Sequence, residues 1–229
     1  MRFPVINDFL GLVFPKTCCV CSRSLFEFEQ QICKVCLSRL PLTIHHLHPQ
    51  ENDLTVKIKG LTHTDFVISM LRFTKRGMSQ KLLHQLKYKN KPEVGIELGQ
   101  IYGSMIHTLS ESRGWTQLTS VPLHPLKQQR RGYNQSEQFA IGLSKSLGIP
   151  VKEVLQRTAF TESQTNKSRI QRMNNVAEVF KLKTSVEGER VLLVDDVMTT
   201  GATLISCAEL LFRNKATQVD MVVIAAGKF

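Results

Sequence analysis

Hydrophobic and polar positions follow two patterns along most of the chain. Short, wholly apolar runs are typical of strands buried on both faces, and apolar residues spaced three and four apart are typical of helices with one buried side. These patterns predict strands over residues 66–73, 118–123, 151–155, 191–194 and 219–225, and helices over 78–88, 96–109, 136–147 and 203–213. Strands that alternate with helices in this way indicate an α/β fold, with a parallel sheet flanked by helices on both faces.

Two stretches depart from this alternation. Residues 157–175 are polar and show no hydrophobic period, so no helix or strand is predicted there. Near the N-terminus, the apolar residues within 6–13 have helical spacing and predict a short amphipathic helix. Within the regular part of the chain, Ser136 is expected to cap the helix over 136–147.

The composition is that of a globular protein with an excess of positive charge. Hydrophobic residues make up 42% of the 229 residues, which allows a sizeable core and excludes a disordered, collagenous or coiled-coil chain. The 30 Lys and Arg residues outnumber the 19 Asp and Glu residues, so the formal net charge is +11. This excess favours an anionic partner: a nucleic acid, a phosphorylated small molecule, or both.

Nothing in the sequence predicts insertion into a membrane. The longest apolar runs, such as residues 221–226, are far shorter than the roughly 20 residues of a spanning helix. The apolar N-terminus is interrupted by Asp8 and lacks a small-residue cleavage site, so it is a poor signal peptide. We therefore expect a cytoplasmic protein, in which cysteines favour metal binding over disulfides.

Five of the six cysteines lie within residues 18–36. Cys18 and Cys21 form one C-x-x-C pair, and Cys33 and Cys36 form a second pair eleven residues further on. Two such pairs can supply four thiolates to one tetrahedral Zn²⁺, and a closed site of this kind is structural. Cys19 could replace Cys18, although Cys19-x-Cys21 is a poorer chelate, and a redox dithiol or unmetallated thiols are the alternatives to zinc.

The distribution of cysteines also suggests two domains. Residues 1–48 are expected to form an N-terminal helix and a zinc-binding module, which would be marginal without a metal because its core is thin. The polar stretch 45–59 marks the predicted boundary, and residues 60–229 would form the α/β domain. Three histidines in this stretch could bind metal, but a solvated loop is the simpler interpretation, and Cys207 is most simply a core residue.

The most informative segment is VLLVDDVMTTGAT, residues 191–203. A buried strand leads into Asp195 and Asp196, and a Thr/Gly turn then opens a helix. In open α/β sheets, ligands bind beyond the carboxyl ends of strands, and backbone N–H groups at a helix N-terminus bind phosphate. Adjacent carboxylates can accept hydrogen bonds from vicinal hydroxyls or lie near a divalent cation. A ribose 5-phosphate fits both halves of the segment, whereas a plain strand-to-helix turn with exposed acids is the alternative.

Two further segments carry concentrated positive charge. After the strand at 118–123, a loop offers Lys127, Arg130 and Arg131, and guanidinium groups suit pyrophosphate. Residues 72–91 contain seven Lys or Arg and no acid, which could form a face for single-stranded nucleic acid. A solvated surface is the alternative in both cases, and Lys87 could instead point into the phosphate site.

The segment at 191–203 resembles the loop that binds phosphoribosyl pyrophosphate (PRPP) in type I phosphoribosyltransferases. Together with VPLH…RRGYNQ in 121–135 and the N-terminal cysteine pairs, it makes the chain similar to the ComF (ComFC) family, the competence-associated phosphoribosyltransferase-like proteins. Further matches to that family are Phe73 with Gly77, the pair Lys87–Tyr88, and Arg157, Gln164, Arg172 and Asn175.

The resemblance implies a type I phosphoribosyltransferase-like fold and a site for PRPP with Mg²⁺. Asp195 and Asp196 would be the catalytic pair that holds the ribose hydroxyls. Lys87, Arg157 and Arg172 are implied as residues of the active site or of the hood that covers it. The 5-phosphate would be bound by Thr199, Thr200, Gly201, Ala202 and Thr203, and pyrophosphate by His124, Arg130, Arg131 and Gly132.

Two functions are therefore expected, from different classes. The first is a phosphoribosyltransferase or transferase-like enzyme, linked through the family resemblance to DNA uptake in natural transformation. The second is a non-catalytic accessory protein that binds single-stranded DNA or a competence helicase and keeps the fold as a scaffold. The sequence does not identify the acceptor of the phosphoribosyl group.

Overall fold

Four parallel strands form the sheet of the computed structural model, which describes residues 15–158 and 179–227. Their order is β1-β6-β5-β2, and every neighbouring pair is parallel. A separate antiparallel pair joins β3 (Leu155–Arg157) to β4 (Phe180–Leu182). The sheet strands are β1 (Val67–Arg72), β2 (Gln117–Ser120), β5 (Arg190–Met198) and β6 (Gln218–Ala226).

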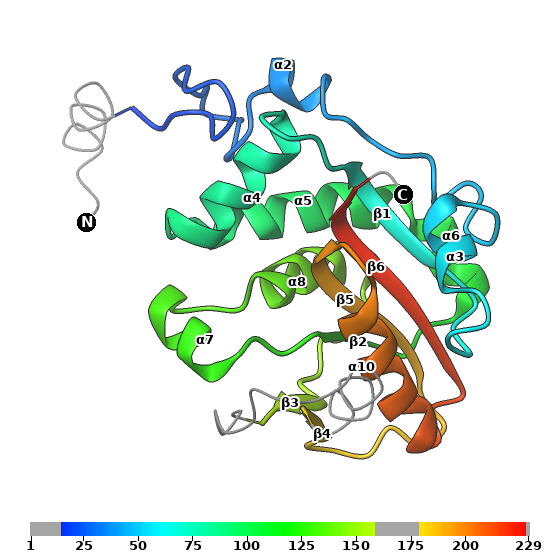
Figure 1. The fold of residues 1–229 in the computed structure, drawn as a ribbon. Helices are drawn as coiled ribbons and strands as arrows, with labels where there is room; N and C mark the ends of the chain where they lie inside the picture. Colours follow the sequence, from blue (N-terminus) through cyan, green and yellow to red (C-terminus); the bar gives the residue numbers. More distant parts are fainter. Residues whose placement is uncertain (1–14, 159–178, 228–229) are drawn as a thin grey trace.

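Helices cover both faces of this sheet, as the sequence predicts (Figure 1). On one face lie α4 (Met78–Tyr88), α5 (Pro92–Met105) and α8 (Gln135–Leu147), and α10 (Ala202–Arg213) packs on the other. The remaining described helices are α2 (Lys34–Leu37), α3 (Asp53–Ile58), α6 (His107–Arg113) and α7 (Pro125–Arg131). The predicted N-terminal helix lies outside the described residues.

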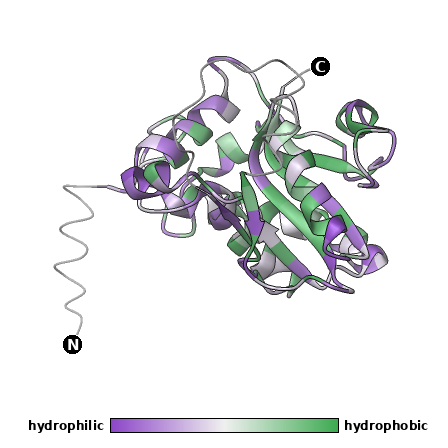
Figure 2. Ribbon diagram, turned by 60° about the horizontal axis from the view of Figure 1, so that its bottom comes forward, coloured by the Kyte–Doolittle hydropathy of each residue, from purple (hydrophilic) through white to green (hydrophobic). Residues whose placement is uncertain are grey.

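The core has two parts, one on each face of the sheet. Along β6, Val222 and Ile224 pack toward α5 and α8, whereas Met221 and Val223 pack toward α10. Because successive side chains of a strand point to opposite faces, an apolar run is what a doubly covered strand requires. Figure 2 shows this pattern, with the strands mostly hydrophobic and the outer helices of mixed character.

Two glycines let α5 and α8 pack with their backbones in contact. A Cβ on Gly99 would lie 2.3 Å from the carbonyl oxygen of Phe139, and one on Gly142 would lie 2.2 Å from that of Ile96. Neither position can hold a side chain without moving a helix. This close packing fixes the start of α8 against the sheet, where Ser136 takes part in the candidate site.

Several predicted boundaries are wrong. The helix expected at 96–109 is instead α5, which starts at Pro92, followed by α6 after a break at Ile106. The strand expected at 151–155 is absent from the described residues; Val151 only bridges Leu118, and β3 begins at Leu155. The strand expected at 191–194 continues through both acids to Met198, because β5 stays paired with β6 to that residue.

The sequence analysis also missed the helices α2, α3 and α7, and it misplaced one cap. α3 lies within the polar stretch chosen as a domain boundary and is capped by the Asn52 side chain. α7 occupies the segment expected to be a basic loop. The N-cap of α8 is Asn134, whose side chain accepts from the N–H of Ser136, so the assignment of Ser136 as the cap is wrong. No helix in the described part of the chain has the length and apolar character needed to cross a bilayer.

Candidate functional site

The carboxyl ends of the parallel strands meet at one edge of the sheet. There β1 leads to α4, β2 leads to α7, and β5 leads through residues 199–201 to α10. Ligands of open α/β sheets bind at this edge. The residues that the sequence analysis selected for chemistry follow β2 and β5, and Lys87 joins them from the far end of α4.

Asp195 is held by hydrogen bonds on the inner side of this edge. Its Oδ1 accepts from the Ser136 hydroxyl at 2.8 Å and from the backbone N–H of Asp196, also at 2.8 Å. Burial, followed by the neighbouring charge of Asp196, raises the pKa of Asp195 to about 7, although both hydrogen bonds and Lys87 oppose the shift. The side chain therefore keeps its proton to a higher pH than an ordinary aspartate does.

Asp196 faces a different partner. Its Oδ2 lies 2.8 Å from the ammonium nitrogen of Lys87, and both side chains are half-buried, with 16% and 22% of their surface exposed. The structure thus brings Lys87 to the acidic pair, as one of the two interpretations of the basic stretch expects. A cation already stands beside the carboxylate that the sequence analysis assigned to ribose or metal.

The turn after β5 passes through a glycine before it enters α10. Gly201 adopts φ +82°, a conformation that side chains disfavour, and a Cβ there would lie 2.9 Å from the Met198 methyl group. The backbone then enters α10, whose N-terminus carries partial positive charge. The other four loop residues are exposed: Thr199, Thr200, Ala202 and Thr203.

A lysine that sequence reasoning missed reaches this loop. The ammonium group of Lys57, on α3, donates to the carbonyl oxygen of Thr199 at 2.8 Å. Since α3 itself was not predicted and Lys57 belongs to no motif, no signal in the sequence pointed to it. Ser136 was also missed as a partner of Asp195, because it was interpreted only as a helix cap.

The predicted pyrophosphate segment is mostly helical. The His124 ring accepts from the N–H of Leu126 and caps α7, and Gly132, with φ +78°, ends that helix. Arg130 is exposed. Arg131 donates to the Gln135 side chain at 2.7 Å, and its guanidinium carbon lies 5.4 Å from the ring centre of Tyr88.

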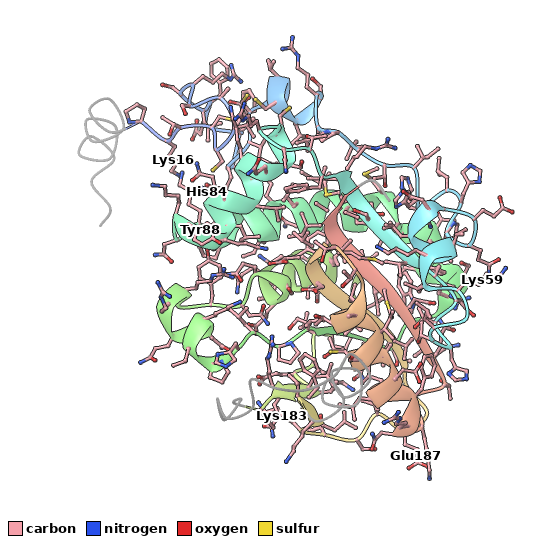
Figure 3. The ribbon with its side chains drawn as sticks, in the orientation of Figure 1. Lys16, Lys59, His84, Tyr88, Lys183 and Glu187 are labelled. Atoms are coloured by element: carbon pink, nitrogen blue, oxygen red, sulfur yellow. The ribbon has the colours of Figure 1, made fainter. Side chains whose placement is uncertain are left out.

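Tyr88 makes an exposed aromatic surface close to Lys87. Its ring is 67% exposed and lies 5.2 Å from the ring of His84, one turn earlier in α4. Figure 3 labels both residues on α4, with Tyr88 nearer α7. An exposed ring flanked by a guanidinium group can stack against a planar ligand.

Of the two arginines expected in the hood, the structure describes only Arg157. Arg157 ends β3, and its guanidinium carbon lies 5.5 Å from the ring centre of Phe180 on β4. Its Nε is buried and has no hydrogen-bond partner among the described residues. Arg172, and all of the expected hood from residue 159 to 175, lie outside the described residues.

The four cysteines of the two pairs form one cluster. The sulfur atoms of Cys18, Cys21, Cys33 and Cys36 all lie within 4.8 Å of one another. Cys19 points elsewhere, toward the Gln31 amide at 3.7 Å and the Lys91 ammonium group at 3.6 Å, so it does not replace Cys18. Four convergent sulfur atoms are the donor set of a structural Zn²⁺ site.

The electrostatics around Cys33 suit a thiolate ligand. Burial alone would raise the pKa of this thiol. The N–H of Cys36, the Arg23 guanidinium group and neighbouring thiols outweigh burial and lower the pKa of Cys33 to about 6. The cluster also belongs to the larger of the two cores, in which three of its cysteines pack with residues of α4 and α5.

The basic stretch at 72–91 does not form a continuous free face. Lys87 pairs with Asp196, Lys91 with the Cys19 thiol, and Lys81 with the Val20 carbonyl oxygen. The exposed remainder consists of Arg72, Lys75, Arg76 and Lys89. Part of the positive charge thus stabilises the site and the contact with the cysteine module.

Comparison with known proteins agrees with this architecture. A phosphoribosyl transferase domain model matches residues 134–228, which include the start of α8, the acidic pair and α10. The fold is therefore that of a phosphoribosyltransferase-like domain behind a four-cysteine module. Among solved structures, the chain is similar to a hypoxanthine phosphoribosyltransferase from Staphylococcus aureus, with 20% identity, a TM-score of 0.37, and coverage of 57% of this chain and 64% of that one.

Sequence relatives define the family more closely. The "DNA utilization protein YhgH" of Escherichia coli is 33% identical over 144 residues, which cover 61% of this chain and 63% of the relative. "Competence protein F" of Haemophilus influenzae is 40% identical over 95 residues, covering 40% and 42%. "Competence protein ComFC" of Bacillus subtilis is 24% identical over 212 residues, covering 86% of each chain.

The chain carries a phosphoribosyl transferase domain and is similar to the ComF/YhgH competence proteins. The alignment spans slightly less than two thirds of the YhgH protein. The family resemblance inferred from the motifs is confirmed.

Proposed function

We propose that the carboxyl edge of the sheet binds PRPP and transfers its phosphoribosyl group. The observation that carries this proposal is the position of Asp195 and Asp196 at the end of β5, directly before the glycine turn that opens α10. In this assignment the two carboxylates accept hydrogen bonds from the ribose hydroxyls. Residues 199–203 bind the 5-phosphate through backbone N–H groups and threonine hydroxyls.

Positive groups surround the proposed ligand. Lys57, already 2.8 Å from the Thr199 carbonyl oxygen, would add charge beside the 5-phosphate. The pyrophosphate would lie toward α7, where His124, Gly132 and the guanidinium groups of Arg130 and Arg131 are found. Planar, multi-donor guanidinium groups stabilise the charge that develops on a departing pyrophosphate.

The proposed reaction is a displacement at ribose C1. The bond from C1 to the pyrophosphate oxygen breaks, and its electron pair leaves with pyrophosphate. A nucleophilic atom of the acceptor forms the new bond to C1 and gives up its proton to solvent. The carboxylates of Asp195 and Asp196 would stabilise the positive charge on the sugar in the transition state, and the segment at 157–175, with Arg157 and Arg172, would exclude water.

Two metals fit the residues that are present. Carboxylate oxygens are the ligands that Mg²⁺ prefers, and Asp195 and Asp196 would hold it with PRPP; bound there, it would neutralise charge on the diphosphate. The four sulfur atoms of the cysteine cluster fit Zn²⁺ in a structural role.

We also propose a cytoplasmic location, and a division of the chain into two domains over residues 1–48 and 60–229.

The test is isothermal calorimetry of the zinc-loaded full chain with PRPP and MgCl₂. Wild-type protein should bind, and a variant carrying Asp195→Asn and Asp196→Asn should lose measurable binding while keeping its circular dichroism spectrum. Glu187→Gln is the matched control. Glu187 lies in the turn before β5, is exposed, and pairs with Lys215, which follows α10. Unchanged affinity in the folded double variant would refute the site assignment. Pyrophosphate release with candidate bases and amines would then report turnover.

A second function is favoured by a separate observation. The relatives named for DNA utilization and competence, together with the net charge of +11, support binding of single-stranded DNA or of a helicase that handles it. In this case the fold would serve as a scaffold or PRPP sensor. Fluorescence anisotropy with a single-stranded oligonucleotide at increasing salt distinguishes the two. Steeply salt-dependent binding without any PRPP-dependent product would favour the second function.

A further inference from the structure

The cysteine module presents an exposed pair of stacked aromatic rings. Phe26 and Phe28 are 59% and 65% exposed, and their ring centres lie 5.6 Å apart with the planes only 16° from parallel. Large apolar side chains that gather on a surface often mark a binding site. The two rings lie in the segment between the two cysteine pairs, so the metal cluster would hold them in place.

A cation lies over each ring, and the two cations are held differently. The Arg23 guanidinium carbon is 5.4 Å from the ring centre of Phe26, and the same group pairs with Glu29 at 2.6 Å. The Lys34 ammonium nitrogen is 4.4 Å from the ring centre of Phe28, and it has no ion-pair partner in the part of the chain that the structure describes. Lys34 is therefore the cation that can move aside.

A groove of about 320 Å³ opens beside Phe28 and Lys34. Ile32, Leu37 and Ile101 line it, and the half-buried side-chain amide of Gln100, on α5, is available within it. The two carboxyl groups at the groove are already bonded. Glu29 accepts from Arg23 and from two backbone N–H groups, and Glu97 accepts from the backbone N–H of Gln31 at 2.8 Å.

We propose that Phe26, Phe28, Lys34 and this groove form a stacking site for an unpaired base of single-stranded DNA. A base stacks on Phe28 and takes the place of the Lys34 ammonium group, because stacking on an exposed ring is stronger than an exposed cation–ring contact. Lys34 then pairs with the adjoining phosphate, and the Gln100 amide bonds to an edge of the base. The proposal rests on the second function above and places its site on the module, away from the PRPP site.

Nucleic acid fits this surface better than an apolar peptide does. Two cations border the rings, and the whole chain is strongly positive. A phosphate backbone matches that charge, and stacked rings accept any base face without sequence preference. The exposed ring pair and the groove beside it supply what the interrupted basic stretch at 72–91 lacks, a surface for bases as well as for phosphates.

The test compares a labelled oligothymidylate with an abasic oligonucleotide of equal length, using the zinc-loaded full chain and fluorescence anisotropy. Wild-type protein should bind the oligothymidylate several-fold more tightly than the abasic strand. Phe28→Ala should weaken binding to oligothymidylate about tenfold and leave the salt dependence unchanged. Lys34→Gln should reduce the slope of log affinity against log salt by about one. Val35→Ala, an exposed apolar position next to Lys34, is the matched control and should change nothing.

The outcomes distinguish failure of this inference from failure of either proposed function. If wild-type protein binds the oligonucleotide and Phe28→Ala, with normal zinc content, binds equally well, the site lies elsewhere and the inference is wrong. Equal affinity for the abasic strand would also overturn it, since charge alone would then explain binding. If no oligonucleotide binds, the DNA-binding function itself fails, and PRPP binding, measured separately, is unaffected.

Discussion

The cysteine cluster and the acidic edge of the sheet are two polar sites built in opposite ways. The four clustered cysteines come from one segment of 18–36, and they need only local turns to converge. The acidic edge collects Lys87 from α4, Ser136 from α8 and two acids from β5. The first site would therefore use a bound metal to order a local segment, whereas the second depends on the folded core to bring distant segments together.

Substitutions should therefore affect the two sites in different ways. Removing a ligand from the cluster should loosen its own segment, because the cluster joins the two cysteine pairs, while the packing of that segment on α4 and α5 stays in place. Removing a polar group from the edge should change binding and pH dependence but leave the fold, because the sheet and helices are packed through two large cores.

Removal of one buried cysteine should have the largest effect. Cys33→Ser, or chelation of the metal, should abolish zinc binding, which stabilises small zinc modules by ~10–16 kcal/mol. We expect one zinc per wild-type chain by elemental analysis, little in the variant, and rapid proteolysis of the variant between residues 15 and 40. Cys19→Ser is the control and should keep the metal, since Cys19 lies outside the cluster. Loss of zinc in the Cys19 variant alone would contradict the ligand set.

Substitution at the loop glycine should have the next largest effect. Gly201→Ala forces a side chain into φ +82° and against the Met198 methyl group, so unfolding free energy should fall by about 1–3 kcal/mol. Gly188→Ala separates the two causes, because Gly188 has φ +77° and open space where a Cβ would lie. Urea denaturation should show a larger loss for Gly201→Ala than for Gly188→Ala. Equal losses would mean that the Met198 contact contributes nothing.

The pH dependence of stability should report on Asp195. Its pKa in the folded protein, about 7, lies above the ordinary value of 3.8, so ionisation costs the folded state free energy. That cost is absent below about pH 4, grows up to about pH 7 and is constant above it. Asp195→Asn removes the cost and should gain roughly 1–3 kcal/mol over wild type at pH 8 but little at pH 4. Urea midpoints across this range check the difference, and a gain that shrinks as pH rises would contradict the assignment.

The smallest effect should come from Lys87. Lys87→Met removes the partner of Asp196 and a charge that lowers the pKa of Asp195, so the pH at which stability changes should move upward. The change in unfolding free energy at neutral pH should stay within ~1 kcal/mol, because the pair is only partly withdrawn from water. Lys89→Met, two residues on and exposed, should leave the pH profile where it is.

Much of the fold could be predicted because its signals are local. The strand at 66–73 and the helix at 78–88 are confirmed, since an apolar run and a one-sided apolar stripe each indicate one structure. α7 was missed although Pro125 at its first turn and Gly132 at its end are ordinary helix boundaries; its lack of an apolar stripe hid it, and none of its residues is buried. The end of β5 was missed because two adjacent acids are more typical of a loop than of a buried strand. In the structure, β5 stays paired with β6 beyond both acids.

The candidate site was predictable only as far as its motifs reach. The spacing of the four cysteines indicates a metal site, and the residue pattern of 191–203 indicates a phosphate site. The Lys57 contact with Thr199 and the Ser136 bond to Asp195 depend on how helices pack, and no local pattern contains that information. Lys87 was named through the resemblance, and its pairing with Asp196 required the folded chain.

The continuation of β5 through both acids has a consequence for how this protein could diversify. Asp195 and Met198 are paired in register with Val223 and Ala226 of β6, so the two carboxylates lie on a rigid frame. The exposed side chains of the neighbouring helices α4 and α7 can change without disturbing that frame. Under the proposed function, related proteins could therefore change the molecule that receives the ribosyl group while the residues that bind the donor stay the same.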